Sequence, residues 1–182
     1  MLFRSLPVTD IKSLIAYAKA KGGRATFAVG SVGSAGHLGT ELLKKNGMDY
    51  TVVPYKGTAP AFQGLIGGQI DGFLDPILGS LQYHKNGLLR VIAVTSAQRT
   101  PNLPDVPTVA ETIPGYEFYS WYGLSAPVKA PQEIKDLLNA QVNKALATDM
   151  KDKLISQGLI VGGAASKTSA SFRPTTWPSL RS

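Results

Sequence analysis

The stretch TFAVGSVGSAGHLGTE, residues 26–41, joins a short apolar segment to a run of small residues and then to a segment of helical character. Residues 27–29 are apolar and β-prone, as expected of a buried strand, and the glycines and serines of residues 30–36 follow at once. Residues 38–46 then have the pattern of a helix. The stretch therefore predicts a strand, a loop and a helix start, the repeating unit of an α/β sheet.

The glycine and serine loop has the composition of an anion-binding loop. Small residues let backbone N–H groups and hydroxyls approach a bound group closely, and a helix N-terminus adds roughly half a positive charge that favours carboxylate or phosphate. In that case a bulky side chain at Gly33 is expected to close the loop sterically. A tight turn between strand and helix would need the same glycines, so both interpretations stay open.

Composition limits the classes of protein that the chain can belong to. Its 182 residues are 43% hydrophobic, enough for one domain or two small ones. The 19 basic and 12 acidic residues give a net charge of +7, but the basic residues occur singly or in short pairs, which indicates a solvated surface and no nucleic-acid partner. The chain has no cysteine, no apolar run long enough to span a bilayer, and no signal-peptide pattern at its start.

The alternation of helix, strand and loop repeats through the first half of the chain. Thr9 is the expected N-cap of a first helix, and Pro60 opens a third. This rhythm predicts a mainly parallel sheet covered by helices. Strands are expected at residues 25–29, 50–53, 70–74 and 88–94, with helices ending near residues 22, 46, 65 and 83.

Ligands of such sheets bind at the carboxyl ends of the strands, so the loops after Val29, Val53 and Leu74 should meet at one edge. Asp75 as a cap of the following helix, and Lys56 as an ordinary surface lysine, are alternatives to ligand contacts. The polar candidates at this edge are Ser31, Ser34 and His37 from the first loop, Tyr55, Lys56 and Thr58 from the second, and Asp75 from the third.

Known catalytic and cofactor signatures are absent from the sequence. Gly30, Gly33 and Gly36 have the spacing GxxGxxG, which is neither the dinucleotide motif nor a P-loop, and His37 and His84 lack a metal-ligand pattern. No cofactor or metal is therefore expected, and the residues suit binding better than bond breaking. The alternative is a small α/β hydrolase-like enzyme that acts on a carboxyl or phosphate ester, with Ser34 and His37 as its catalytic residues.

The second half of the chain changes in character. Residues 99–126 hold three closely spaced prolines and then an aromatic cluster, which suggests a crossing segment and a return strand. Pro131 should begin an amphipathic helix, with a shorter helix at residues 149–157. The expected organisation is an α/β domain over residues 1–98, the crossing segment over 99–126, C-terminal helices over 127–163, and a disordered tail over 164–182.

An ordered series of motifs over residues 6–162 resembles the substrate-binding proteins of tripartite tricarboxylate transporters, the Bug family. The motifs are LPV at residues 6–8, AKA at 18–20, GS to HL at 30–38, VPYKGTAPA at 53–61, GGQID at 67–71, Arg99, LPDVPTVAE at 103–111, WYGL at 121–124 and AP at 126–127.

This resemblance implies one lobe of a receptor of periplasmic-binding-protein type II, with C-terminal helices of the other lobe. Such receptors are periplasmic, hold a carboxylate between one βα loop of each lobe, and deliver it to membrane permease subunits. Nothing here resembles the signal peptide or first lobe, so the C-terminal apolar stripe should lack its cover and favour self-association. The implied ligand-binding residues are Ser31, Gly33, Ser34, Ala35, His37, Tyr55, Lys56, Gly57, Thr58, Ala59 and Asp75.

Overall fold

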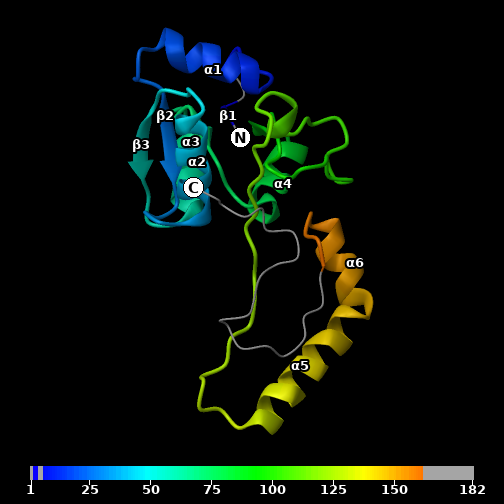
Figure 1. Ribbon diagram of the computed structural model, residues 1–182. Helices are drawn as coiled ribbons and strands as arrows, with labels where there is room; N and C mark the ends of the chain where they lie inside the picture. Colours follow the sequence, from blue (N-terminus) through cyan, green and yellow to red (C-terminus); the bar gives the residue numbers. More distant parts are fainter. Residues whose placement is uncertain (1, 4–5, 162–182) are drawn as a thin grey trace. The chain divides into compact units, whose positions relative to one another are not determined.

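The computed structural model describes residues 2–3 and 6–161 of the chain (Figure 1). The chain divides into two compact units, one up to Ser120 and one from Trp121 onward. The tail expected at residues 164–182 lies outside the described residues. The domain boundaries expected near residues 98, 126 and 163 stay predictions.

A five-stranded sheet, mostly parallel, forms the centre of the first unit. The strand order is β3-β2-β4-β1-β5, and β2 pairs in parallel with both β3 and β4. β1 was not predicted; it pairs antiparallel with β4 and β5. The mainly parallel α/β sheet expected from the sequence is therefore confirmed. The strands are β1 (Leu2–Phe3), β2 (Thr26–Val29), β3 (Thr51–Pro54), β4 (Gly72–Phe73) and β5 (Leu89–Arg90).

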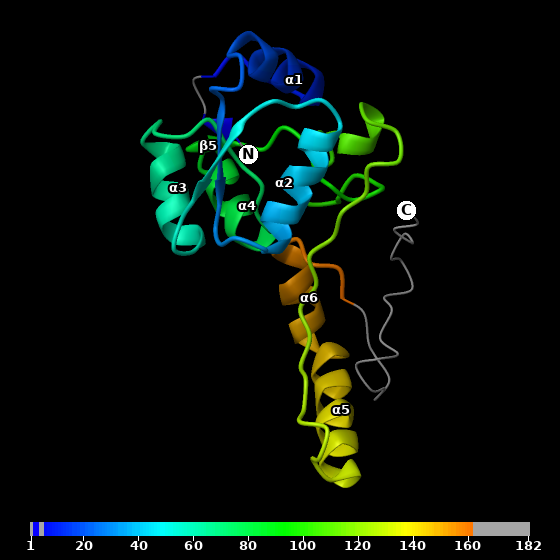
Figure 2. The same ribbon diagram turned by 60° about the vertical axis from the view of Figure 1, so that its left-hand side comes forward.

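Helices follow β2, β3 and β4 in turn and cover both faces of the sheet. Successive residues of a strand point to opposite faces, and Phe27 of β2 lies in one apolar cluster with Leu14 and Leu43 while Ala28 lies in another with Phe62. Figure 2 accordingly shows α2 and α3 on opposite sides of β2. The helices are α1 (Ile11–Ala20), α2 (Ala35–Lys45), α3 (Thr58–Ile66) and α4 (Ile77–Lys85), with a short 3₁₀ helix η1 (Val109–Glu111).

The starts of these helices differ from the expected ones. Thr9 as the first N-cap is wrong, because the Asp10 carboxylate accepts the Ser13 N–H at 2.7 Å and the Ser13 hydroxyl accepts the Asp10 N–H at 3.1 Å. α2 begins three residues before Leu38, since Ser34 caps it. α3 begins two residues before Pro60, which a first helical turn tolerates because it needs no N–H there.

Three expected strands are also shorter or absent, and of these the strand expected at residues 70–74 is reduced to β4. The strand expected at residues 88–94 is reduced to β5 and a single parallel bridge between Val94 and Thr108. The described residues from 112 to 131 contain no strand, so the return strand is wrong; Phe118 instead donates one backbone hydrogen bond to Thr95. Tyr116 is buried there and donates its hydroxyl proton to the Gly39 carbonyl at 2.8 Å, whereas Trp121 and Tyr122 are exposed.

The second unit contains α5 (Gln132–Leu146) and α6 (Asp149–Ser156). α5 begins at Gln132, one residue later than expected, because Pro131 is its N-cap and not its first helical residue. No residue of either helix is buried. In the part of the chain that the structure describes, no helix has the length and apolarity needed to cross a membrane.

Asp71 joins α1 to the sheet just before β4. Its carboxylate accepts hydrogen bonds from the Tyr17 hydroxyl at 2.6 Å, the Lys21 ammonium at 3.0 Å and the Thr26 backbone N–H at 2.8 Å. Burial raises the pKa of Asp71, but these donors from Tyr17, Thr26 and Lys21 outweigh it and hold the pKa below its ordinary value. The charged form of Asp71 therefore stabilises the fold.

We expect Asp71→Asn to lower the free energy of unfolding by about 1–3 kcal/mol at neutral pH, because four donor groups, on Tyr17, Lys21 and Thr26, lose a charged acceptor. The folded pKa lies below the unfolded one, so this stability is present above the ordinary carboxyl pKa and is lost as pH falls through the lowered value. The wild type and the variant should thus converge in acid. Urea denaturation followed by circular dichroism tests this, with the exposed Asp49→Asn as the control of equal charge change.

Candidate functional site

The loops after β2, β3 and β4 meet at the carboxyl edge of the sheet, as the sequence predicted. Backbone hydrogen bonds tie the first two loops together: Tyr55 N–H donates to the Val29 carbonyl and Gly57 N–H to the Gly30 carbonyl, both at 2.8 Å. A Cβ atom at Gly36 would overlap the Leu74 carbonyl oxygen, so the third loop lies directly against the start of α2. Three loops far apart in the sequence thus share one edge.

The N-termini of α2 and α3 both open onto this edge. The first N–H groups of a helix have no acceptor within the helix and carry partial positive charge. In α2, the His37 N–H is satisfied by the Ser34 hydroxyl at 3.3 Å, whereas α3 has no side-chain cap at all. Its N-cap Gly57 has φ +110°, a left-handed conformation that glycine adopts without strain. Both helices therefore present backbone donors at the same edge of the sheet.

His37 has a different place from the one expected. Its Nδ1 accepts the backbone N–H of Gly33 at 3.0 Å, and its Nε2 lies 3.9 Å from a carboxylate oxygen of Glu41, one turn further along α2. Gly33 itself has φ +81°. One of the N–H groups expected to face an anion is thus directed at the imidazole of the same loop. Ser31 is exposed, and its carbonyl accepts the Ser34 N–H at 3.2 Å.

Steric closure of the loop by a side chain at Gly33 stays a prediction, and the rest of the chain makes no clash there. No heavy atom lies within 4 Å of the position that a Cβ atom would take. A side chain at Gly33 would instead strain the backbone, because φ +81° is unfavourable for any residue with a Cβ. The glycine whose close approach does exclude a side chain is Gly36, which the site prediction omitted although it is the third glycine of the GxxGxxG spacing.

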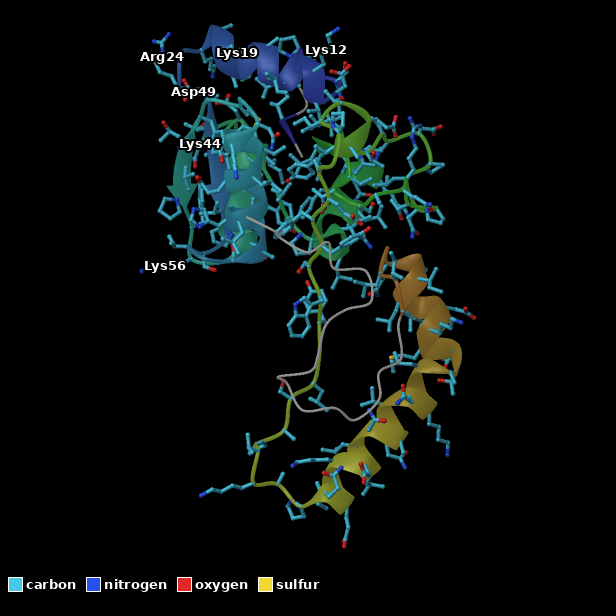
Figure 3. The ribbon with its side chains drawn as sticks, in the orientation of Figure 1. Lys12, Lys19, Arg24, Lys44, Asp49 and Lys56 are labelled. Carbon is cyan, nitrogen blue, oxygen red and sulfur yellow. The ribbon has the colours of Figure 1, made fainter. Side chains whose placement is uncertain are left out.

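Tyr55 and Lys56 lie at the second loop but face away from the donors. A Cβ atom at Gly64 would overlap the Tyr55 hydroxyl, so the phenol ring packs along the middle of α3. Lys56 is exposed, and Figure 3 shows its side chain extending outward from the loop. The other labelled cations, Lys12, Lys19, Arg24 and Lys44, lie at the opposite end of the sheet. None of the labelled cations is therefore directed over the helix N-termini.

Asp75 follows β4 and lies against the first turn of α4. It is not a helix cap: the N-cap is Pro76, and no side chain donates or accepts a capping bond there. A Cβ atom at Gly79 would lie 3.1 Å from an Asp75 carboxylate oxygen and 3.3 Å from the Phe62 ring, which places the carboxyl group beside an apolar neighbour. Burial raises the pKa of Asp75 to about 7. Its charge consequently changes near neutral pH.

Comparison with known proteins identifies the family. The family model described as "Tripartite tricarboxylate transporter family receptor" matches residues 2–169 of the chain. The chain belongs to this family. Two curated relatives are a UPF0065 protein in the tcbD-tcbE intergenic region of Pseudomonas sp. strain P51, 35% identical over 86% of this chain and 48% of its own length, and protein BugT of Bordetella pertussis, 35% identical over 78% and 44%. The chain thus spans about half the length of these relatives.

Solved structures agree with the fold assigned from the sequence. R. palustris Rpa4515 with adipate has a TM-score of 0.87 and 39% identity, covering 91% of this chain and 56% of that one. The periplasmic binding protein BugD has a TM-score of 0.79 and 34% identity, and MatC from Rhodopseudomonas palustris with bound malate has 0.80 and 31%; each covers 86% of this chain and 54% of its own. The periplasmic-binding-protein fold class expected from the sequence is therefore confirmed.

The loop before α2 does not support the alternative of a hydrolase-like enzyme. Ser34 Oγ accepts the backbone N–H of His37, while the imidazole is directed to Gly33 and Glu41, so the serine hydroxyl and the histidine ring form no nucleophile and base pair. The proteins that the chain resembles are receptors and binding proteins rather than enzymes. Among the described residues, no group of three or more His, Asp or Glu side chains is placed to hold a metal ion.

We expect Asp75→Asn to change how the stability of the chain depends on pH. The folded pKa of about 7 lies above the ordinary value of 3.8, so neutral Asp75 contributes stability that is complete below the lower value and lost as pH rises through the higher one. The variant should unfold with a free energy about 1–3 kcal/mol higher than the wild type in mild alkali, since one pKa unit corresponds to about 1.4 kcal/mol. Denaturation curves at acid and mildly alkaline pH measure it; identical pH dependence in both proteins would contradict the assignment.

Proposed function

We propose that this chain binds the carboxylate groups of small organic acids at the carboxyl edge of its sheet, as part of a solute receptor of a tripartite tricarboxylate-type transport system. The observation that carries the proposal is that α2 and α3 both begin at the same edge of the sheet, joined by the hydrogen bond from the Gly57 N–H to the Gly30 carbonyl, and that their first turns leave backbone N–H groups without helical acceptors. Thr58 and Ser34 stand at these starts and add hydroxyl groups.

Two ligands in related structures support a carboxylate of this kind. Rpa4515 is seen with adipate and MatC with malate, and both ligands carry two carboxylates. A carboxylate at paired helix N-termini gains charge-assisted N–H hydrogen bonds and interacts favourably with both helix dipoles. The edge suits this ligand without a nearby cation, which agrees with Lys56 facing outward. The contacts proposed here are the N–H groups of residues 35–36 and 58–59 and the Ser34 and Thr58 hydroxyls.

The family supports the rest of the receptor role. Family membership suggests a periplasmic receptor that delivers its ligand to membrane permease subunits, and the resemblance to BugD supports the same location. We include both the periplasmic location and the permease partner in the proposal. Binding without turnover distinguishes this role from that of an enzyme.

Gly33→Ala and Gly47→Ala make a matched pair for testing the site. Gly33 has φ +81° and Gly47 has φ +90°, and a Cβ atom at either would meet nothing within 4 Å. Each substitution should therefore cost a similar roughly 1–2 kcal/mol of backbone strain. We expect only Gly33→Ala to weaken malate or adipate binding in calorimetry, because only Gly33 lies in the loop that opens α2.

Two further comparisons sharpen this calorimetric test. Lys56→Ala should change affinity by no more than about threefold, since exposed charge pairs contribute little. Adipamide, which has the length of adipate without its charges, should not bind. Equal affinities for all three variants, or binding of adipamide as strong as that of adipate, would mean that the loops form only a turn.

We also propose that the chain self-associates through α5 and α6. The side chains that carry this proposal are between 40% and 55% exposed, and they are Ile134, Leu137, Leu138, Val142, Met150 and Ile155. Burying one such side chain contributes roughly 1.5–3 kcal/mol, and apolar stripes of this size on a helix mark contact surfaces. A second copy of the chain offers the same stripe, so a symmetric contact can cover both.

We expect Leu138→Glu with Val142→Glu to lower the molar mass measured by light scattering towards that of a monomer, because both charges fall on the apolar stripe. Gln132→Glu with Gln141→Glu adds the same charge at exposed polar positions of α5 and should leave the mass unchanged. A wild-type chain that is monomeric at all concentrations tested would rule out the association.

A further inference from the structure

We propose that His37 is a positioning residue: its imidazole holds the loop before α2 in the binding conformation by accepting the Gly33 N–H, and protonation of the ring releases the loop and weakens carboxylate binding. This inference rests on the proposed function, because the affinity that it regulates is the one proposed above. The hydrogen bond itself, at 3.0 Å, belongs to the ligand-free structure and can be tested without a ligand.

The two contacts of the His37 imidazole define which ring nitrogen carries the proton. Nδ1 accepts the Gly33 N–H, so Nδ1 carries no proton and the neutral ring holds its proton on Nε2. That Nε2–H lies on the side of Glu41, whose carboxylate oxygen is 3.9 Å away. Glu41 thus favours the tautomer in which Nδ1 is free to accept.

His37 also contacts the loop through its backbone. The His37 N–H donates to Ser34 Oγ at 3.3 Å, and the Ser34 N–H donates to the Ser31 carbonyl at 3.2 Å. Gly33 supplies the remaining bond, and its φ of +81° turns its N–H back towards the first turn of α2. Without the Nδ1 acceptor, no described group accepts the Gly33 N–H, and the left-handed residue loses the contact that offsets its conformational freedom.

Protonation removes this acceptor, because both ring nitrogens of a histidinium are donors. Histidine is the side chain whose charge ordinarily changes between about pH 5 and 8. A positive ring near a carboxylate would by itself strengthen binding at low pH. Release of the loop acts in the opposite direction, so the sign of the pH dependence separates a positioning role from direct charge attraction.

The charged groups at this edge of the sheet come from three elements. Glu41 faces the imidazole from the same helix, and the other two loops at this edge carry Lys56 after β3 and Asp75 after β4. Neither forms an ion pair with His37 among the described residues. Asp75 titrates near neutral pH, since burial raises its pKa to about 7. Binding measurements must therefore be made in the Asp75→Asn background, which removes that second titration.

Two substitutions at His37 separate the effect of the hydrogen-bond acceptor from the effect of the ring's charge. In His37→Asn the amide Oδ1 occupies the branch position of Nδ1, so it can accept the Gly33 N–H at every pH without titrating. His37→Leu has similar bulk and no acceptor. Lys56→Ala serves as the control on the neighbouring loop, because its exposed side chain takes no part in holding Gly33.

The first readout is amide hydrogen exchange of Gly33 in the ligand-free chain, corrected for the intrinsic rate at each pH. We expect protection at about pH 8 that falls at about pH 5 in the wild type, protection at both in His37→Asn, and none in His37→Leu. Loss of one neutral hydrogen bond corresponds to about a fivefold fall in protection. Equal protection in all three proteins at both pH values would overturn the proposal.

The second readout is malate and adipate affinity by calorimetry. We expect affinity to fall about fivefold between about pH 8 and pH 5 with His37, to be independent of pH with His37→Asn, and to be weak at both with His37→Leu. Affinity that rises at low pH and loses that rise in His37→Asn would overturn positioning in favour of direct attraction. If no variant binds malate or adipate while Gly33 exchanges as expected, the proposed ligand class is wrong. The role of the imidazole in holding the loop would still stand.

Discussion

The site depends on direct contacts between the backbones of three loops at one edge of the sheet. Gly30 accepts the Gly57 N–H, and Gly36 lies so close to the Leu74 carbonyl that a Cβ atom would overlap it. Close packing of this kind leaves no room for adjustment by side chains. The position of the α2 N-terminus against the third loop therefore depends on the missing Cβ of Gly36. The polar side chains around it are secondary to that constraint.

Much of the fold could be predicted because local signals agree with each other. Apolar runs placed β2 and β3, and glycine or proline bounded most helices. The helix starts were predicted less accurately. Asp10 and Ser34 cap their helices by accepting the backbone N–H of the residue three positions later, and this pairing is overlooked when residues are considered one at a time. β1 and the weak pairing around Val94 depend on distant partners, so periodicity alone gave no information on them.

Prediction of the site succeeded at the level of loops and failed at the level of side-chain direction. Which loops meet follows from topology. The direction of Tyr55 along α3, the exposure of Lys56 and the bond between Gly33 and His37 depend on packing that spacing does not encode. Gly36 was overlooked because a glycine needed for close approach and one needed for a turn look identical in a sequence. Only its contact with Leu74 separates the two.

Backbone donors suit a receptor that must release its ligand. A buried lysine facing a carboxylate must first lose its own hydration, and removing either partner then leaves an uncompensated charge. Neutral N–H groups at a helix start are already fixed in direction and lack only an acceptor, so they lose little on binding and leave no stranded charge on release. Two ionisable groups of the loops at this edge are His37, whose Nδ1 accepts the Gly33 N–H, and Asp75, which loses its negative charge in acid. The pH dependence of such a site depends on how strongly each of these groups is coupled to the loops, and of the two the imidazole is the one that accepts a hydrogen bond directly from the loop before α2, at Gly33.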